Sequence, residues 1–144
     1  MDDPNITYAR EIVAKDPMAS FLGIRLEEVR RAYARLSVEV RPEYLNAHDR
    51  AHGMILSSMI DQAAAVAANS MEDDVLLVEL KINYLAAAVP GERITAEARP
   101  VDIKKSLSLW TVDVRGASGT LVATGHALGY HRIRNKREGK KGGR

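Results

Sequence analysis

The chain has 144 residues, of which 46% are hydrophobic and 28% charged, with no cysteine and a net charge of +2. This composition excludes a disordered or fibrous chain, a disulfide framework and a thiolate metal site, and the length suits one domain with its own core. No apolar run is long enough to span a bilayer, and the start MDDPNITYAR lacks the basic residues of a signal peptide, so we expect a cytoplasmic protein.

The positive charge is concentrated at the end of the chain. Residues 132–144, RIRNKREGKKGGR, carry +6, so that residues 1–131 carry −4. A basic, Gly-rich end without aromatic residues is typical of a solvated, disordered tail, which we assign to residues 134–144. Nucleic acid is not expected as a partner, because no recognised DNA-binding or RNA-binding motif accompanies this charge.

The first elements are a helical segment and a pair of strands. Residues 4–15 form an amphipathic pattern with Asp3 as the cap and Pro4 at the first position, and a shorter helical turn through Met18 and Phe21 follows. We assign residues 1–20 as an N-terminal helical segment of the same domain. Apolar side chains then occupy alternate positions, as one buried face of a strand pair requires: Ile24, Leu26, Ala32, Ala34, Leu36, Val38 and Val40.

A loop over residues 41–53 leads into a predicted helix over residues 53–70, which is rich in Ala, Met, Leu and Ile. Four strand-like runs come next, over residues 75–85, 93–103, 106–116 and 120–133. Their short connections favour antiparallel pairing. A helix that is apolar almost all round has to be covered, so we expect an α+β fold in which the sheet wraps around this helix.

Asp61 is the only acidic residue in this helix. A polar stripe on the solvent side, made of residues at spacings of three and four, accounts for it: Ser57, Ser58, Asp61, Gln62 and Ala65. From spacing alone, this is the favoured interpretation.

A functional interpretation begins at Gly53, whose backbone N–H is an unsatisfied donor at the positive end of the helix and suits a developing oxyanion. Gly53 and Asp61 are eight residues apart, about 12 Å along a helix, so one carbonyl group cannot touch both. If they act together, they come from two chains whose helices are antiparallel. Chemistry at these residues therefore predicts a dimer.

The stretches RPEYLNAHDRAHGMILSSMIDQAAAVAANS and LLVELKINYLAAAVPGERITAEARPVDIKKSLSLWTVDV resemble the PaaI-type hotdog acyl-CoA thioesterases, and the resemblance runs over residues 21–133. The order and spacing characteristic of this family are present in Asn46, His52, Gly53, Asp61 and the run Ile82-Asn83-Tyr84-Leu85. Together these residues are specific, whereas His52-Gly53 alone would not be.

The resemblance implies a hotdog fold for residues 21–133, with a central helix wrapped by a curved antiparallel sheet and with sheets joined in a dimer or a tetramer. It implies hydrolysis of acyl-CoA, which arrives as substrate, without a further cofactor or a metal. Gly53 would donate to the thioester oxygen, Asn46 would position the thioester or the water, and Asp61 of the neighbouring chain would act as base or nucleophile.

Three positions depart from the family pattern. Met54 replaces a second glycine and narrows the substrate pocket, Asp49 stands where glycine is usual, and the apolar Leu77 lies near the position of a hydroxyl residue in some relatives. Lys104 and Lys105 are expected either as solvated lysines or, given the resemblance, as contacts for the phosphates of CoA.

His48 and His52 are four residues apart, but no third histidine or cysteine ligand is evident, so no metal is expected. His52, which belongs to the catalytic pattern, is expected to shape the loop through hydrogen bonds. Two other functions remain open: a hotdog hydratase or dehydratase that uses His52 and Asp61 as general acid and base, and a non-catalytic acyl-CoA sensor.

Overall fold

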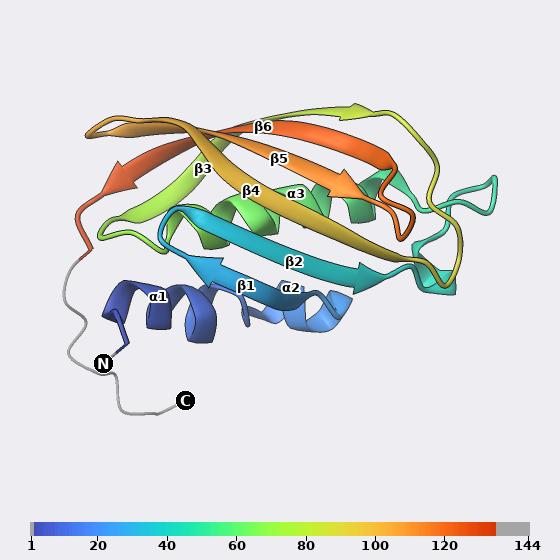
Figure 1. The fold of residues 1–144 in the computed structure, drawn as a ribbon, viewed down its shortest axis with the longest axis horizontal. Helices are drawn as coiled ribbons and strands as arrows, with labels where there is room; N and C mark the ends of the chain where they lie inside the picture. Colours follow the sequence, from blue (N-terminus) through green and yellow to red (C-terminus); the bar gives the residue numbers. More distant parts are fainter. Residues whose placement is uncertain (1, 135–144) are drawn as a thin grey trace.

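A six-stranded antiparallel sheet curls around one long helix, α3, in the computed structural model, which describes residues 2–134 (Figure 1). The sheet has the order β1-β2-β4-β5-β6-β3. Its strands are β1 Arg25–Arg30, β2 Tyr33–Glu39, β3 Asp74–Tyr84, β4 Arg93–Ile103, β5 Leu107–Arg115 and β6 Leu121–Arg132. The predicted strands are confirmed and all paired strands are antiparallel, but the expected pairing of the consecutive strands β3 and β4 is wrong.

The order of the strands in the sheet differs from their order in the chain, which the sequence pattern did not predict. β3 does not pair with β4, the next strand along the chain, but lies at the far edge of the sheet beside β6, from Asp74↔Arg132 to Tyr84↔Ala123. The connection over residues 85–92 therefore crosses the sheet before β4 pairs with β2. As a result β1 and β3 are the two edge strands.

The core lies between the concave face of the sheet and α3, Gly53–Ala68. Alternate residues of β2, β4 and β5 point into it and are fully buried, among them Leu36, Val38, Ile94, Trp110 and Val112. Gly125 lets the helix approach β6 closely, because a Cβ at this position would lie 2.6 Å from the Cγ2 atom of Ile60. The sheet thus covers the apolar side of α3, as expected.

The helix α3 ends two residues before the predicted boundary because Asn69 ties its last turn to β3. The Asn69 Nδ2 donates to the carbonyl oxygens of Ala65 and Val75, and its Oδ1 accepts from the Val75 N–H at 3.0 Å. No helix within residues 2–134 has the length and apolar character that crossing a bilayer requires.

The N-terminal segment covers one flank of α3. It comprises α1, Pro4–Tyr8, a π-helical turn over Ala9–Val13, and α2, Pro17–Leu22. The predicted Asp3 cap is confirmed, since its Oδ1 accepts from the Asn5 N–H at 2.8 Å, and Asp16 caps α2 in the same way. Gln62 Nε2 of α3 donates to the carbonyl of Val13 at 2.8 Å and so fastens this segment to the central helix.

Arg134, the last described residue, makes several contacts with the loop before β3, the end of α3 and α1. Its Nε donates to Asp74 at 2.7 Å, its Nη2 donates to the carbonyl of Asp73 at 2.6 Å, and its guanidinium lies 4.0 Å above the Tyr8 ring. An additional bond from Nη2 reaches the Asn69 carbonyl at 3.2 Å. The rest of the basic tail predicted for residues 134–144 lies outside the described residues.

A buried Ser–His–Asp chain links β5, β6 and the loop before β3. His131 has Nε2 at 2.7 Å from the Ser108 Oγ and Nδ1 at 3.1 Å from Asp73, while the Trp110 Nε1–H donates to the same Ser108 Oγ at 2.7 Å. Such a chain is the arrangement of a hydrolytic triad. Ser108, however, is only 2% exposed, and Trp110 already bonds its oxygen, so this chain holds the sheet together.

Ser108→Ala is therefore expected to lower the free energy of unfolding by about 1–3 kcal/mol, because the buried Trp110 N–H and the buried Nε2 of His131 both lose their hydrogen-bond partner. Denaturant unfolding measures this change, with Ser106→Ala, an exposed serine of the same hairpin, as the matched control. Activity per folded molecule should stay at the parent level. Loss of activity in a folded Ser108→Ala protein would contradict the structural role.

Candidate active site

The first turn of α3 presents a free backbone donor. His52 caps the helix, with its Nδ1 accepting the Met54 N–H at 3.0 Å, which confirms that this histidine shapes the loop through hydrogen bonds. The Gly53 N–H has no acceptor within residues 2–134. Because the N-terminal end of a helix carries partial positive charge, this N–H suits an anion or an oxyanion.

Tyr84, at the end of β3, packs directly on Gly53. A Cβ at Gly53 would lie 3.1–3.3 Å from the Tyr84 ring and hydroxyl atoms, and the hydroxyl donates to the Gly53 carbonyl at 3.4 Å. Tyr84 is 55% exposed, so it borders the site as well as packing on Gly53. The only feature of the sequence that pointed to Tyr84 as a site residue was its position in the motif Ile82–Leu85.

The loop before α3 is organised by Asn46. Its Oδ1 accepts from the backbone N–H groups of His48, at 2.9 Å, and Arg50, at 3.2 Å, and Asp49 within this turn has a φ of 57°. That left-handed conformation explains why a glycine would suit position 49. The Asn46 Nδ2 has no acceptor in the described part of the chain, so it is the part of this side chain that is available to a ligand.

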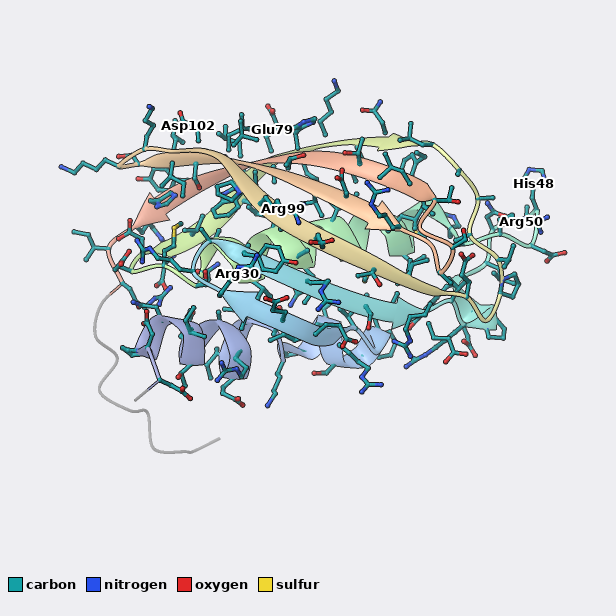
Figure 2. All side chains as sticks on the ribbon, viewed as in Figure 1. Arg30, His48, Arg50, Glu79, Arg99 and Asp102 are labelled. Atoms are coloured by element: carbon teal, nitrogen blue, oxygen red, sulfur yellow. The ribbon has the colours of Figure 1, made fainter. Side chains whose placement is uncertain are left out.

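Among residues 2–134, no third metal-ligating side chain joins His48 and His52. His48 is exposed at the tip of the loop and points away from the body, as Figure 2 shows. Across residues 2–134, no group of three or more His, Cys, Asp or Glu side chains is placed to hold a metal ion.

Asp61 lies on the open face of α3. This face carries the expected stripe of exposed or half-buried residues, which also includes Met54: Ser57, Ser58, Asp61, Gln62 and Ala65. Asp61 lines a cavity of about 240 Å³ between α2 and α3, together with Asp16, Met18 and Ser58. Although Asp61 remains open to solvent, neighbouring protein atoms and then the negative charge of Asp16 raise its pKa above the ordinary carboxyl value.

A larger cavity of about 650 Å³ adjoins the start of α3. Its walls come from α2, from the loop after β2 and from α3, and they include Phe21, Tyr44, His52, Met54 and Ile55. Met54 projects into this region and is 67% exposed. Leu22 and Ser58 line both cavities, so the two form neighbouring parts of one groove between α2 and α3.

The remaining predicted residues lie far from Gly53 within one chain. Lys104 sits on the turn between β4 and β5, where it pairs with Asp102 at 3.3 Å, and Lys105 follows it. This turn adjoins Leu107 of β5. Leu107 pairs with Tyr130 of β6, and Tyr130 pairs in turn with Leu76 of β3, so the turn lies at the Leu76 end of β3. Eight residues of β3, about 26 Å, separate Leu76 from Tyr84 beside Gly53.

Figures 1 and 2 show the same separation. The turn between β4 and β5, marked by Asp102, lies at the left end of the molecule, whereas the loop bearing His48 and Arg50 before α3 lies at the right end. Leu77 packs partly buried against the core. One chain therefore does not bring the lysines, Asp61 and Gly53 together.

Comparison with known proteins gives a consistent set of relatives. The model of the thioesterase superfamily matches residues 48–123. A putative esterase of Archaeoglobus fulgidus is 32% identical over 80% of this chain and 75% of its own length, and the acyl-coenzyme A thioesterase PaaI of Escherichia coli is 26% identical over 74% and 76%.

Solved structures share the fold. The E. coli PaaI structure superposes with a TM-score of 0.85 at 23% identity, covering 89% of this chain and 93% of that one. A Streptococcus mutans protein bound to acetyl-CoA superposes with a TM-score of 0.75 at 20% identity, covering 78% and 91%. The arrangement of sheet and helix is thus the hotdog fold expected from the sequence.

Proposed function

The chain belongs to the thioesterase superfamily as a PaaI-type hotdog acyl-CoA thioesterase, and from this premise we propose that it hydrolyses acyl-CoA at sites shared by two copies. The observation that carries this proposal is the free Gly53 N–H at the start of the helix whose open face bears Asp61. A donor for the oxyanion and a carboxylate are the two parts that thioester hydrolysis needs.

The edge strand β3 supports the pairing of two chains. Its outer edge has no strand partner within residues 2–134, and it carries the exposed apolar side chains Leu76 and Val78. An exposed apolar edge is a ready surface for another strand. Antiparallel pairing of two β3 strands continues the sheet and makes the two α3 helices antiparallel, so that Asp61 of one copy approaches Gly53 of the other.

The same pairing brings the Leu76 end of one β3 toward the Tyr84 end of the other. The turn bearing Lys104 and Lys105 of one copy then lies at the end of the sheet where Gly53 of the other copy is found. We propose that these lysines contact the CoA phosphates, to which ammonium groups are attracted as point charges.

Hydrolysis then proceeds as follows. Water attacks the thioester carbonyl carbon while Asp61 takes a proton from it, and the Gly53 N–H donates to the negative oxygen that forms. The C–S bond breaks as the carbonyl is restored, and the proton passes to the CoA sulfur. Asn46 Nδ2 and Tyr84 flank the carbonyl. The raised pKa of Asp61 favours the base role, since a stronger base takes the proton more readily; direct attack by the carboxylate is the alternative.

The experiment that tests the function is thiol release from a panel of aryl-, short-, medium- and long-chain acyl-CoAs. Hydrolysis of at least one class with a kcat/KM well above that of the heat-denatured protein is the expected result. Retention of every thioester, with binding alone, would favour the sensor over the enzyme.

The charge of Asp16 gives a prediction about pH. Asp61 acts as a carboxylate, so its raised pKa moves the acid limb of kcat/KM to higher pH. Asp16→Asn removes a nearby negative charge and should shift that limb toward lower pH, while asparagine still caps α2. Asp3→Asn, the same change at the cap of α1, is the matched control. An identical acid limb in the Asp16 variant would show that the limb does not report Asp61.

A further inference from the structure

We infer that the 650 Å³ cavity beside Gly53 holds the acyl group and that Arg41 selects acyl groups bearing a carboxylate at their far end. This inference rests on the proposed function and adds a substrate class to it: acyl-CoAs derived from dicarboxylic acids. Arg41 was not singled out by the sequence pattern. Arg41 is exposed at the rim of the cavity, and the argument rests on this position and on the absence of a protein partner for its guanidinium within residues 2–134.

The cavity begins at the reacting group. His52 and Met54, the residues on either side of Gly53, both line it, and its volume lies in the range of small-ligand sites. A sphere of this volume is about 11 Å across, whereas an extended pantetheine arm spans roughly 15 Å or more at ordinary bond lengths. The acyl group fits this cavity, and the CoA phosphates on the end of the arm fall outside it.

Tyr44 spans the cavity from the reacting end to the far end. Its carbonyl accepts the His52 N–H at 2.7 Å, and its hydroxyl donates to the carbonyl of Leu22 at the end of α2. The guanidinium carbon of Arg41 lies 5.5 Å from the centre of the Tyr44 ring. Arg41 also rests on Gly23, directly after Leu22, and so it occupies the α2 end of the cavity, away from His52.

Gly23 makes room for this guanidinium. Gly23 has a φ of 72°, and a Cβ there would lie 2.0 Å from the Nη2 of Arg41. The end of α2 does not need Arg41 as a cap, because the Tyr44 hydroxyl bonds the Leu22 carbonyl and the Gly23 N–H bonds the Ser20 carbonyl at 3.2 Å.

Arg41 has no ion pair and donates no hydrogen bond within residues 2–134, unlike Arg99, which pairs with Glu97 at 2.8 Å. Glu43 is the only acidic side chain that lines the cavity, and it makes no ion pair with Arg41 among the described residues. A guanidinium beside an apolar wall with unused donors matches the fork of a carboxylate. An acyl chain ending in a carboxylate supplies the missing partner.

The test compares two thioesters of equal chain length, adipoyl-CoA and hexanoyl-CoA. The parent protein should prefer adipoyl-CoA, and the ratio of their kcat/KM values should fall about 10- to 100-fold in Arg41→Gln, the range expected for a charged hydrogen-bonded pair. Arg41→Lys should retain part of the preference. Arg50→Gln, at an exposed arginine of the same loop outside the cavity, is the matched control and should leave the ratio within about twofold.

Each outcome decides the inference. Equal losses on both substrates in a folded Arg41→Gln protein would assign Arg41 to the CoA phosphates, which the two substrates share, and would overturn the inference. If the parent protein hydrolyses hexanoyl-CoA and shows no preference for adipoyl-CoA, the inference about Arg41 is also overturned. The proposed function, hydrolysis of acyl-CoA, is then unaffected. Failure of the parent protein to hydrolyse any thioester in the panel would overturn the proposed function, and this inference with it.

Discussion

Replacing Asp61 by asparagine is expected to lower kcat for acyl-CoA hydrolysis by about two to four orders of magnitude, the usual contribution of a positioned general base. Asparagine keeps the size and the hydrogen-bonding shape of the side chain but does not take a proton from water. Thiol release with the best substrate of the panel measures the change. Ser57→Ala, at another position on the open face of α3, is the matched control and should remain within about threefold of the parent.

The direction of the Asp61 pKa shift predicts how the Asp61→Asn change affects the stability of the fold. The folded-state pKa of Asp61 is raised, so the folded protein favours the protonated carboxyl; this stabilisation is complete below the unfolded pKa and is lost as the pH rises through the folded pKa. At neutral pH the charged Asp61 therefore does not stabilise the fold. Asp61→Asn should unfold at a temperature no lower than the parent.

If a folded Asp61→Asn protein keeps more than a tenth of the parent kcat, the catalytic role of Asp61 is wrong. Asp61 would then be a member of the polar stripe that helical spacing alone predicts, and the raised pKa would reflect only its surroundings.

Replacing Gly53 by proline is expected to lower kcat by about two to three orders of magnitude, because proline removes the one N–H donor assigned to the oxyanion. The backbone tolerates this change: Gly53 is the first residue of α3, where proline is favourable, and His52 before it has the extended φ and ψ of −64° and 143°. The variant thus removes the donor without breaking the helix.

Gly53→Ala is the matched control for the proline variant. Both changes introduce a Cβ that lies 3.1–3.3 Å from atoms of Tyr84, which is half exposed and can move aside, but alanine keeps the N–H. The two variants share the added Cβ, so their difference measures the replacement of the N–H by the proline ring. Equal kcat values for the two would mean that crowding against Tyr84, and not the N–H, determines the loss.

Mixing the two inactive variants tests whether the site crosses between chains. In a mixed pair, the Asp61→Asn chain still supplies Gly53 and the Gly53→Pro chain still supplies Asp61, so one of the two sites is intact. Random pairing after co-expression should restore about a quarter of the parent activity. Recovery of none would place both residues of a working site in one chain, which the 12 Å between them on α3 opposes.

The types and approximate positions of the elements could be read from the sequence because each depends on local pattern, whereas the end of α3 and the π-helical turn after α1 could not. Alternation of Leu36 and Val38 with polar residues marks a strand with one buried face, and the apolar run after Gly53 marks a buried helix. Asp3 and Pro4 mark a helix start through the geometry of the cap. The motif from Asn46 to Leu85 likewise located the candidate site, because its spacing is specific.

Three features of the site depended on contacts between distant residues. Tyr84 meets Gly53 only because β3 lies beside β6 and ends at the start of α3. The pKa of Asp61 rises first because surrounding protein atoms partly bury its carboxylate, and second because α2 folds back over α3 and brings the negative charge of Asp16 near. Arg41 reaches the cavity across Gly23, a neighbour in space that is 18 residues away in the chain.

The elements and the buried face of each strand follow from the sequence alone, because side-chain period and capping act over a few residues. The candidate site residues came from the spacing of the family motif. Contacts between distant parts of the chain set which strand forms the sheet edge, what borders Gly53 and which arginine lines the cavity beside it. The physical reason is that a period of two fixes the face of a strand but not its partner, and partners are chosen by the packing of the whole sheet around α3.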